Sequence, residues 1–189
     1  QNINSPDIAA GTGCLNSGNN LKWILGANPN FTWTGSGNWT TSSNWQGGTA
    51  PGPGDTAIFS AASIQNCSIN TASVGNILIA SGYTGTITQG NAVTLTGLTQ
   101  AGGTFTSGSN NFVLNGSFLL NAGTFSAGSG NKSVSGNWIN SGGTLDGGSS
   151  TIAVSGDWTN NGGTFTPGTS TVKFTSTTAA QAINGMAAS

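Results

Sequence analysis

The sequence contains no histidine, no glutamate and no arginine, and its aspartates and lysines amount to only 4% of 189 residues. Ordinary globular domains carry about 25% charged residues. Without histidine, neither a Ser-His-Asp triad nor a histidine metal site can be built. A pair of carboxyl groups for glycoside hydrolysis would have to come from four aspartates. We therefore expect a protein that is not an enzyme and that uses no cofactor and no metal. The charged side chains are Asp7, Asp55, Asp146, Asp157, Lys22, Lys132 and Lys173.

The small charge also limits the partners that the chain can attract. A formal net charge of −1 gives no basic surface for nucleic acid or for anionic lipid. No apolar run approaches the length of a membrane span, so we expect no membrane insertion. Polarity comes instead from Ser, Thr, Asn and 32 glycines.

Cysteine is almost absent, and the two that occur are Cys14 and Cys67. An even pair with no other redox or metal motif indicates one disulfide and an oxidising compartment, although two free buried thiols remain the alternative. The bridge would close a loop of 67 − 14 = 53 positions, which stabilises a fold by about 4 kcal/mol. Because the chain starts at Gln1 and not at Met, a signal peptide already removed would agree with secretion.

A tandem repeat of 20 residues dominates the second half of the chain. Its units start at Gly102, Ala122, Gly142 and Gly162 and align without gaps. A fixed period of this size is typical of solenoids. Each unit contains several glycines and runs of Ser, Thr and Asn, which disfavour helix, so we expect about three short strands per turn. The predicted fold is all-β, a right-handed parallel β-helix (β-solenoid) with ~20-residue rungs and an N-terminal cap.

Stacking of identical units should place each apolar column of the repeat on itself in the core. The predicted core ladders are Phe105, Phe125, Leu145 and Phe165; Leu114, Val134, Val154 and Phe174; and Phe118, Trp138 and Trp158. Two glycine columns predict turns: Gly108, Gly128, Gly148 and Gly168 form one, and Gly116, Gly136 and Gly156 form the other.

The chain as a whole divides into three parts. Residues 1–30 are irregular and predict a leader or cap, 31–59 hold a Trp-rich motif and the first rung, and 60–189 form the solenoid, with regular repeats from 102. We expect about six turns between Asp55 and Phe174. The pattern drifts after Phe174, so the C-terminal end is predicted to be uncapped, through truncation or as an interface.

Three tryptophans, Trp33, Trp39 and Trp45, stand among glycines and prolines in the second part. We interpret them as a packed aromatic cap, because each ring buries a large apolar area and a solenoid end must be covered. A carbohydrate platform is the alternative, since Trp faces stack on sugar rings.

The motifs W-T-G, N-W, N-W-x-G-G and P-x-x-G-D-x-A-x-F in this region resemble the opening motif of large bacterial surface proteins built on β-solenoids. The later rungs, such as G-D-W-T-N-N-G-G-T-F, resemble repeats of secreted Bacteroidetes adhesins exported by the type IX system. The resemblance covers residues 31 to about 185. It implies a secreted, cell-surface location and an adhesive role, and it implies an O-glycosylation signal at Asp55-Thr56-Ala57, with Thr56 as the acceptor. No sorting domain follows the repeats, which leaves both a fragment and a small standalone protein open.

These observations predict a non-enzymatic, extracellular structural or adhesive protein of a bacterial surface. It would associate with itself head to tail into a filament, or with further repeats of a larger surface protein. The alternative is a module that binds carbohydrate or ice. The column Thr104, Thr124, Thr144 and Thr164 raises the ice hypothesis, with a T-x-T at 104–106 and 164–166, but Ser126 and Asp146 interrupt it. The simpler explanation of the column is that β-branched Thr suits an exposed strand.

Overall fold

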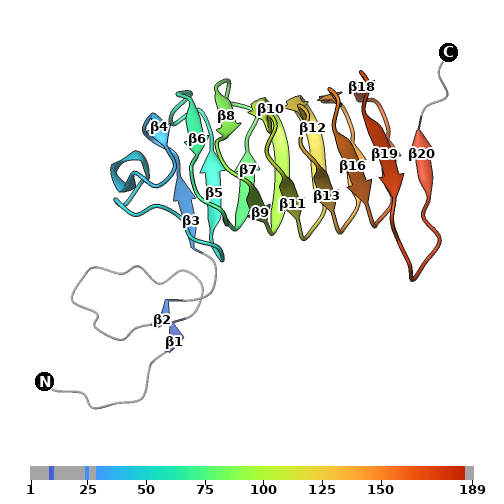
Figure 1. The fold of residues 1–189 in the computed structure, drawn as a ribbon. Coiled ribbons are helices and arrows are strands. Elements are labelled where there is room, and N and C mark those ends of the chain that lie inside the picture. The colour runs from blue at the N-terminus through green and yellow to red at the C-terminus, as the bar shows by residue number, and fades with distance from the viewer. Residues whose placement is uncertain (1–8, 11–23, 26–28, 186–189) are drawn as a thin grey trace, which may run out of the picture.

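The computed structural model describes residues 9–10, 24–25 and 29–185, and it is a parallel β-solenoid of about 6 turns. Figure 1 shows the turns stacked in sequence order along one axis, from β3 to β20. Three short strands per turn form three walls, and every interstrand pair of the named strands is parallel. The fold class and the period predicted from the sequence are confirmed.

The first wall runs the length of the solenoid, from β3 to β20. Its strands are β3 (Asn30–Thr32), β5 (Thr56–Phe59), β7 (Asn76–Ile79), the first part of β10 (Gly97–Thr106), the first part of β12 (Phe118–Ser126), β14 (Trp138–Asn140), β17 (Trp158–Asn160) and β20 (Ile183–Gly185).

The second wall shares β10 and β12 with the first, because both strands bend at register shifts near Ala101 and continue round the corner. Its other strands are β4 (Gly37–Asn38), β6 (Cys67–Ile69), β8 (Thr86–Gln89), β15 (Thr144–Asp146) and β18 (Thr164–Thr166).

The third wall is a separate five-stranded sheet. Its strands are β9 (Val93–Leu95), β11 (Phe112–Leu114), β13 (Lys132–Val134), β16 (Thr151–Val154) and β19 (Thr171–Phe174).

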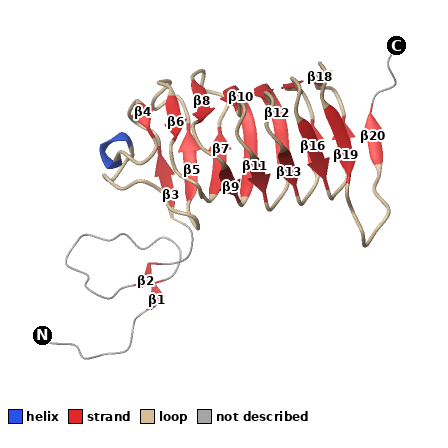
Figure 2. Cartoon of the chain, in the orientation of Figure 1, coloured by secondary structure: helices blue, strands red, loops and turns tan. Residues whose placement is uncertain are grey.

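The one helical turn among the described residues is the 3-10 helix η1 (Ser42–Asn44), which Figure 2 shows beside the first turns.

Register follows the sequence period in the regular part and departs from it at the start. Phe118 pairs with Trp138, and Trp138 with Trp158, each 20 positions on. At the N-terminal end Asn30 pairs with Thr56, and Gly37 pairs with Cys67, which are 26 and 30 positions apart. The extra residues form the loop that carries the tryptophans.

The two predicted turn columns are glycine for different reasons. Gly108, Gly128, Gly148 and Gly168 have φ between 57° and 68°, the left-handed region that side chains avoid. Gly116 instead lies so close to the rung below that a Cβ would come within 2.3 Å of the Thr96 carbonyl oxygen.

The core confirms most of the predicted ladders and corrects one position. Eight of the predicted members are 0% exposed, namely Phe105, Phe125, Leu145, Leu114, Val134, Val154, Phe118 and Trp138, and Trp158 is 7% exposed. Phe165 is half-buried, and Phe174 is 38% exposed although it pairs in register with Val154. The prediction that Phe174 lies in the core is therefore wrong, because no described strand of the third wall pairs with the outer edge of β19 to cover its side chain.

The predicted N-terminal cap lies mostly outside the described residues. Within it, β1 (Ala9–Ala10) pairs in parallel with β2 (Ile24–Leu25). The first-wall strand β3 begins at Asn30, at the predicted boundary between leader and Trp-rich motif.

Candidate functional site

The loop between β3 and β5 packs its three tryptophans into one cluster over the first turns. Trp45 lies at the centre, with ring centroids 5.1 Å from Trp33, 4.7 Å from Trp39 and 5.7 Å from Phe59. Tyr83 extends the cluster, 5.3 Å from Phe59. Most of these contacts are edge to face, the geometry that aromatic quadrupoles favour.

Each indole N–H of this cluster donates to a carbonyl oxygen of a loop. Trp45 Nε1 donates to the Trp39 carbonyl at 2.7 Å, Trp39 Nε1 to Pro51 at 3.2 Å, and Trp33 Nε1 to Gln65 at 3.0 Å. The three side chains are 0 to 2% exposed. They present no ring face to solvent, so the burial agrees with the predicted aromatic cap and contradicts the alternative of a sugar platform at Trp33, Trp39 and Trp45.

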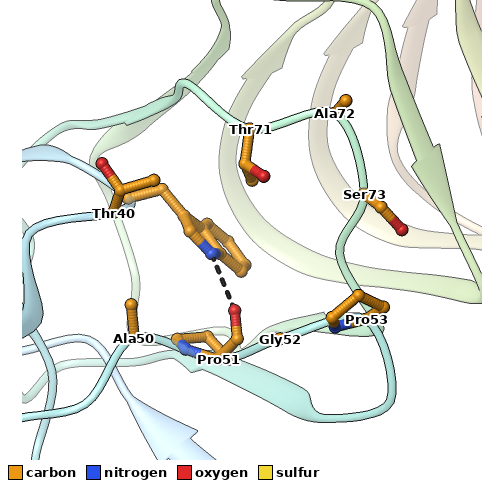
Figure 3. A pocket seen from close by; sticks show the side chains of 9 residues that line it. Thr40, Ala50, Pro51, Gly52, Pro53, Thr71, Ala72 and Ser73 are labelled. Carbon is orange, nitrogen blue, oxygen red and sulfur yellow. Dashed lines mark hydrogen bonds between the residues drawn. The ribbon is translucent and has the colours of Figure 1, made fainter.

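A hollow of about 340 Å³ lies beside this cluster, with Trp39 among its lining residues. Figure 3 shows the hydrogen bond from the indole to the Pro51 carbonyl, with Thr40, Ala50, Pro53 and Ser73 around it. None of the lining residues is ionisable. The hollow therefore holds the hydroxyls of Thr40, Thr71 and Ser73, with no acidic or basic side chain among its lining residues.

The aspartates of the described residues are spread over the fold and bind backbone or neighbouring hydroxyls. Asp55 accepts from the Gly52 N–H at 2.7 Å and fixes a turn before β5. Asp157 accepts from the Ala182 N–H at 2.8 Å beside the first wall, and Asp146 lies on the outside of the second wall. Nowhere in 29–185 do three or more metal-ligating side chains gather.

Lys132 is the charged residue whose position the sequence analysis missed. Its side chain points inward from β13 and is 1% exposed, between Phe112 and Ile152 in register. Nζ donates to the Asn110 carbonyl at 2.8 Å. Burial lowers the pKa of the Lys132 amine from 10.5 to about 8. The signal was present, because Phe112, Ile152 and Val172 fill the same column of the repeat.

Cys67 is buried on β6, and burial raises the pKa of its thiol. Cys14 lies outside the described residues, so the bridge between Cys14 and Cys67 stays a prediction. Thr56, the predicted glycosylation acceptor, lies half-buried on β5 between Asn30 and Asn76. Its modification also stays a prediction.

A relay of side chains along one corner of the solenoid was also missed. Ser117 Oγ accepts from the Asn137 N–H at 3.0 Å, and Asn137 Oδ1 accepts from the Asp157 N–H at 2.9 Å. Asp157 Oδ1 in turn accepts from the Ala182 N–H at 2.8 Å. Each turn thus holds the next one, which explains the polar residue that precedes the aromatic column.

The C-terminal turn leaves apolar side chains in contact with solvent. Ile183 on β20 is 65% exposed and Phe174 on β19 is 38% exposed, while Phe165 and Val172 are half-buried. Among the described residues no strand pairs with the outer edge of β18, β19 or β20. This end of the described solenoid therefore combines unpaired strand edges with exposed apolar side chains.

Comparisons with known proteins give no identity: no family model, no curated protein and no solved structure matches the chain. No described helix is long and apolar enough to cross a membrane.

Proposed function

We propose that this chain is a non-enzymatic structural protein of a bacterial surface, secreted and built as a stiff rod with very little charge. The observation that carries the proposal is the contrast between the two ends of the solenoid. The first turns are covered by the tryptophan cluster, whereas the last turn offers unpaired strand edges with Phe174 and Ile183 exposed. Such an edge invites the addition of another strand.

In this proposal the unpaired strand edges of the last turn accept a strand from residues 1–30 of a second copy, the part of the chain that precedes the covered first turns. The contact is head to tail and does not close on itself, so it generates a filament. Rungs continue across the junction through the same parallel pairing, and the exposed apolar side chains become interior. The resemblance to surface adhesins supports the location, and the scarcity of ionisable side chains supports a non-enzymatic role.

Negative-stain electron microscopy of the concentrated protein tests the proposal. We expect filaments of the width of one solenoid in the unaltered chain. Phe174→Asp and Ile183→Asp should reduce filament length, because each places a carboxylate in the buried junction. Ile64→Asp is the matched control, since Ile64 is 51% exposed in a loop far along the chain from β20. Monodisperse short rods at every concentration, or filaments lost equally in the control, would contradict the filament.

A further inference from the structure

The outward side chains of the second wall form two straight rows. Register places Thr86, Thr104, Thr124, Thr144 and Thr164 in one row, and Thr88, Thr106, Ser126, Asp146 and Thr166 in the other. The sequence repeat predicted the rows only from Thr104 onward. The structure adds Thr86-Ile87-Thr88 of β8, which lies 18 positions before its partner and so escapes the period of 20.

The rows make a regular two-dimensional array. Neighbouring rungs of a parallel sheet lie about 4.8 Å apart, and alternate residues along a strand lie about 6.6 Å apart. Between the rows, Ile87, Phe105, Phe125 and Leu145 point into the core and are 0% exposed. The packed side chains hold the strands in place, so the hydroxyls keep their spacing from turn to turn.

The hydroxyls of the array are available to solvent water. All ten outward side chains of the two rows are half-buried or exposed. Within residues 29–185, the Thr hydroxyls of both rows have no hydrogen-bond partner in the protein, and only Ser126 donates to Asp146, at 3.1 Å. The third wall differs, because its outward positions run Thr94, Val113, Ser133, Ala153 and Lys173.

Charge and shape decide which partner such a face fits. Asp146 is its only ionisable group, so a charged partner finds little to bind. No aromatic ring stands on the rows, so sugar rings have no surface on which to stack. An uncharged partner that hydrogen-bonds with a regular repeat in two directions remains. The surface of an ice crystal is such a partner, because its water molecules repeat at similar spacings.

We propose that the second wall binds ice. The Thr hydroxyls hold a layer of water in a repeat close to that of the crystal, and the Thr methyl groups between them restrict where that water sits. Asp146 interrupts the second row, since its oxygens accept from Ser126 and from the Gly148 N–H at 3.1 Å. This inference is independent of filament formation.

Thermal hysteresis and inhibition of ice recrystallisation, measured on the purified chain, test the inference. We expect activity in the unaltered protein. Thr124→Tyr should remove most of it, because the ring stands in the middle of the array and holds the crystal surface away. Ser133→Tyr is the matched control, since it adds the same ring at an exposed position of the third wall. Asp146→Thr should raise the activity by completing the second row.

Circular dichroism of each variant shows that the strands are intact before the ice measurements are compared. Activity lost in Thr124→Tyr and kept in Ser133→Tyr supports the proposal. Activity no greater than that of an equal mass of serum albumin, in both the unaltered chain and Asp146→Thr, would overturn it. Equal loss in the two tyrosine variants would also overturn it, because the second wall would then have no special role.

Discussion

The tryptophan loop at the start of the solenoid and the regular repeats from 102 onward bury aromatic rings in different ways. In the loop, Trp33, Trp39 and Trp45 meet edge to face, and every indole N–H donates to a carbonyl. In the repeats, Phe105 stacks on Phe125 at 15°, and Trp138 stacks on Trp158 at 17°. The buried N–H of Trp138 has no partner among the described residues.

The difference shows what repetition provides. In the repeats, strand pairing above and below satisfies the backbone, so an aromatic ring need only fit onto its equivalent in the next turn. No described turn of the solenoid precedes the loop, and the carbonyl groups of Trp39 and Pro51 in it accept hydrogen bonds from indole N–H groups. A cap must therefore be specified by particular hydrogen bonds, whereas the ladder tolerates an unpaired donor inside a large apolar contact.

The largest expected effect is at the centre of the cap. Trp45→Ala should lower the free energy of unfolding by about 3–5 kcal/mol, because it removes a fully buried ring from three aromatic neighbours. Trp158→Ala, at the partly open end of the ladder, should cost less. Guanidinium unfolding followed by circular dichroism compares the two. A larger loss of unfolding free energy in Trp158→Ala would contradict the view that the packing of the cap contributes more to stability than the end of the ladder.

A pH effect of intermediate size is expected from Lys132 in the ladder. Because the pKa of its amine is about 8 when folded and 10.5 otherwise, folding favours the neutral amine. Stability is therefore lowest below pH 8 and rises as the pH rises from 8 toward 10.5. The shift corresponds to at most about 3 kcal/mol.

Lys132→Met isolates this effect, since methionine keeps an unbranched side chain without the charge. The difference in unfolding free energy between the variant and the unaltered chain should be greatest below pH 8 and shrink above it. Burial also raises the pKa of Cys67 and Tyr83, which opposes the rise above about pH 9, and the comparison cancels that contribution. A difference that is constant with pH would show that the amine is not desolvated.

The smallest effect compares two identical substitutions. Trp45→Phe removes the donor to the buried Trp39 carbonyl, whereas Trp138→Phe removes an N–H that has no partner. Because both changes remove the same volume, the first should cost about 1–2 kcal/mol more than the second. Thermal or chemical unfolding of the pair measures the difference. Equal costs would mean that the indole hydrogen bonds of the cap contribute little.

Much of the fold could be predicted from the repeat alone. Phe105, Phe125 and Leu145 occupy one column, and stacking on a fixed period leaves them no other place than the core. Before residue 102 the spacing varies, with Asn76 pairing to Gly97 and Ile87 to Phe105, which lie 21 and 18 positions apart. Strand positions there followed from local apolar alternation, but their registers did not.

The position of a turn in the stack decided whether a given side chain is buried, which the repeat pattern alone could not show. Phe174 and Val154 have the same place in the repeat, yet one is exposed and the other buried, because only the latter has a described turn on each side. Trp33, Trp39 and Trp45 suited both a sugar platform and a cap, and only the loop path that turns them inward distinguished the two. Sequence specified the solenoid because burial of a periodic pattern has one solution, while contacts between distant turns fixed the role of each single side chain.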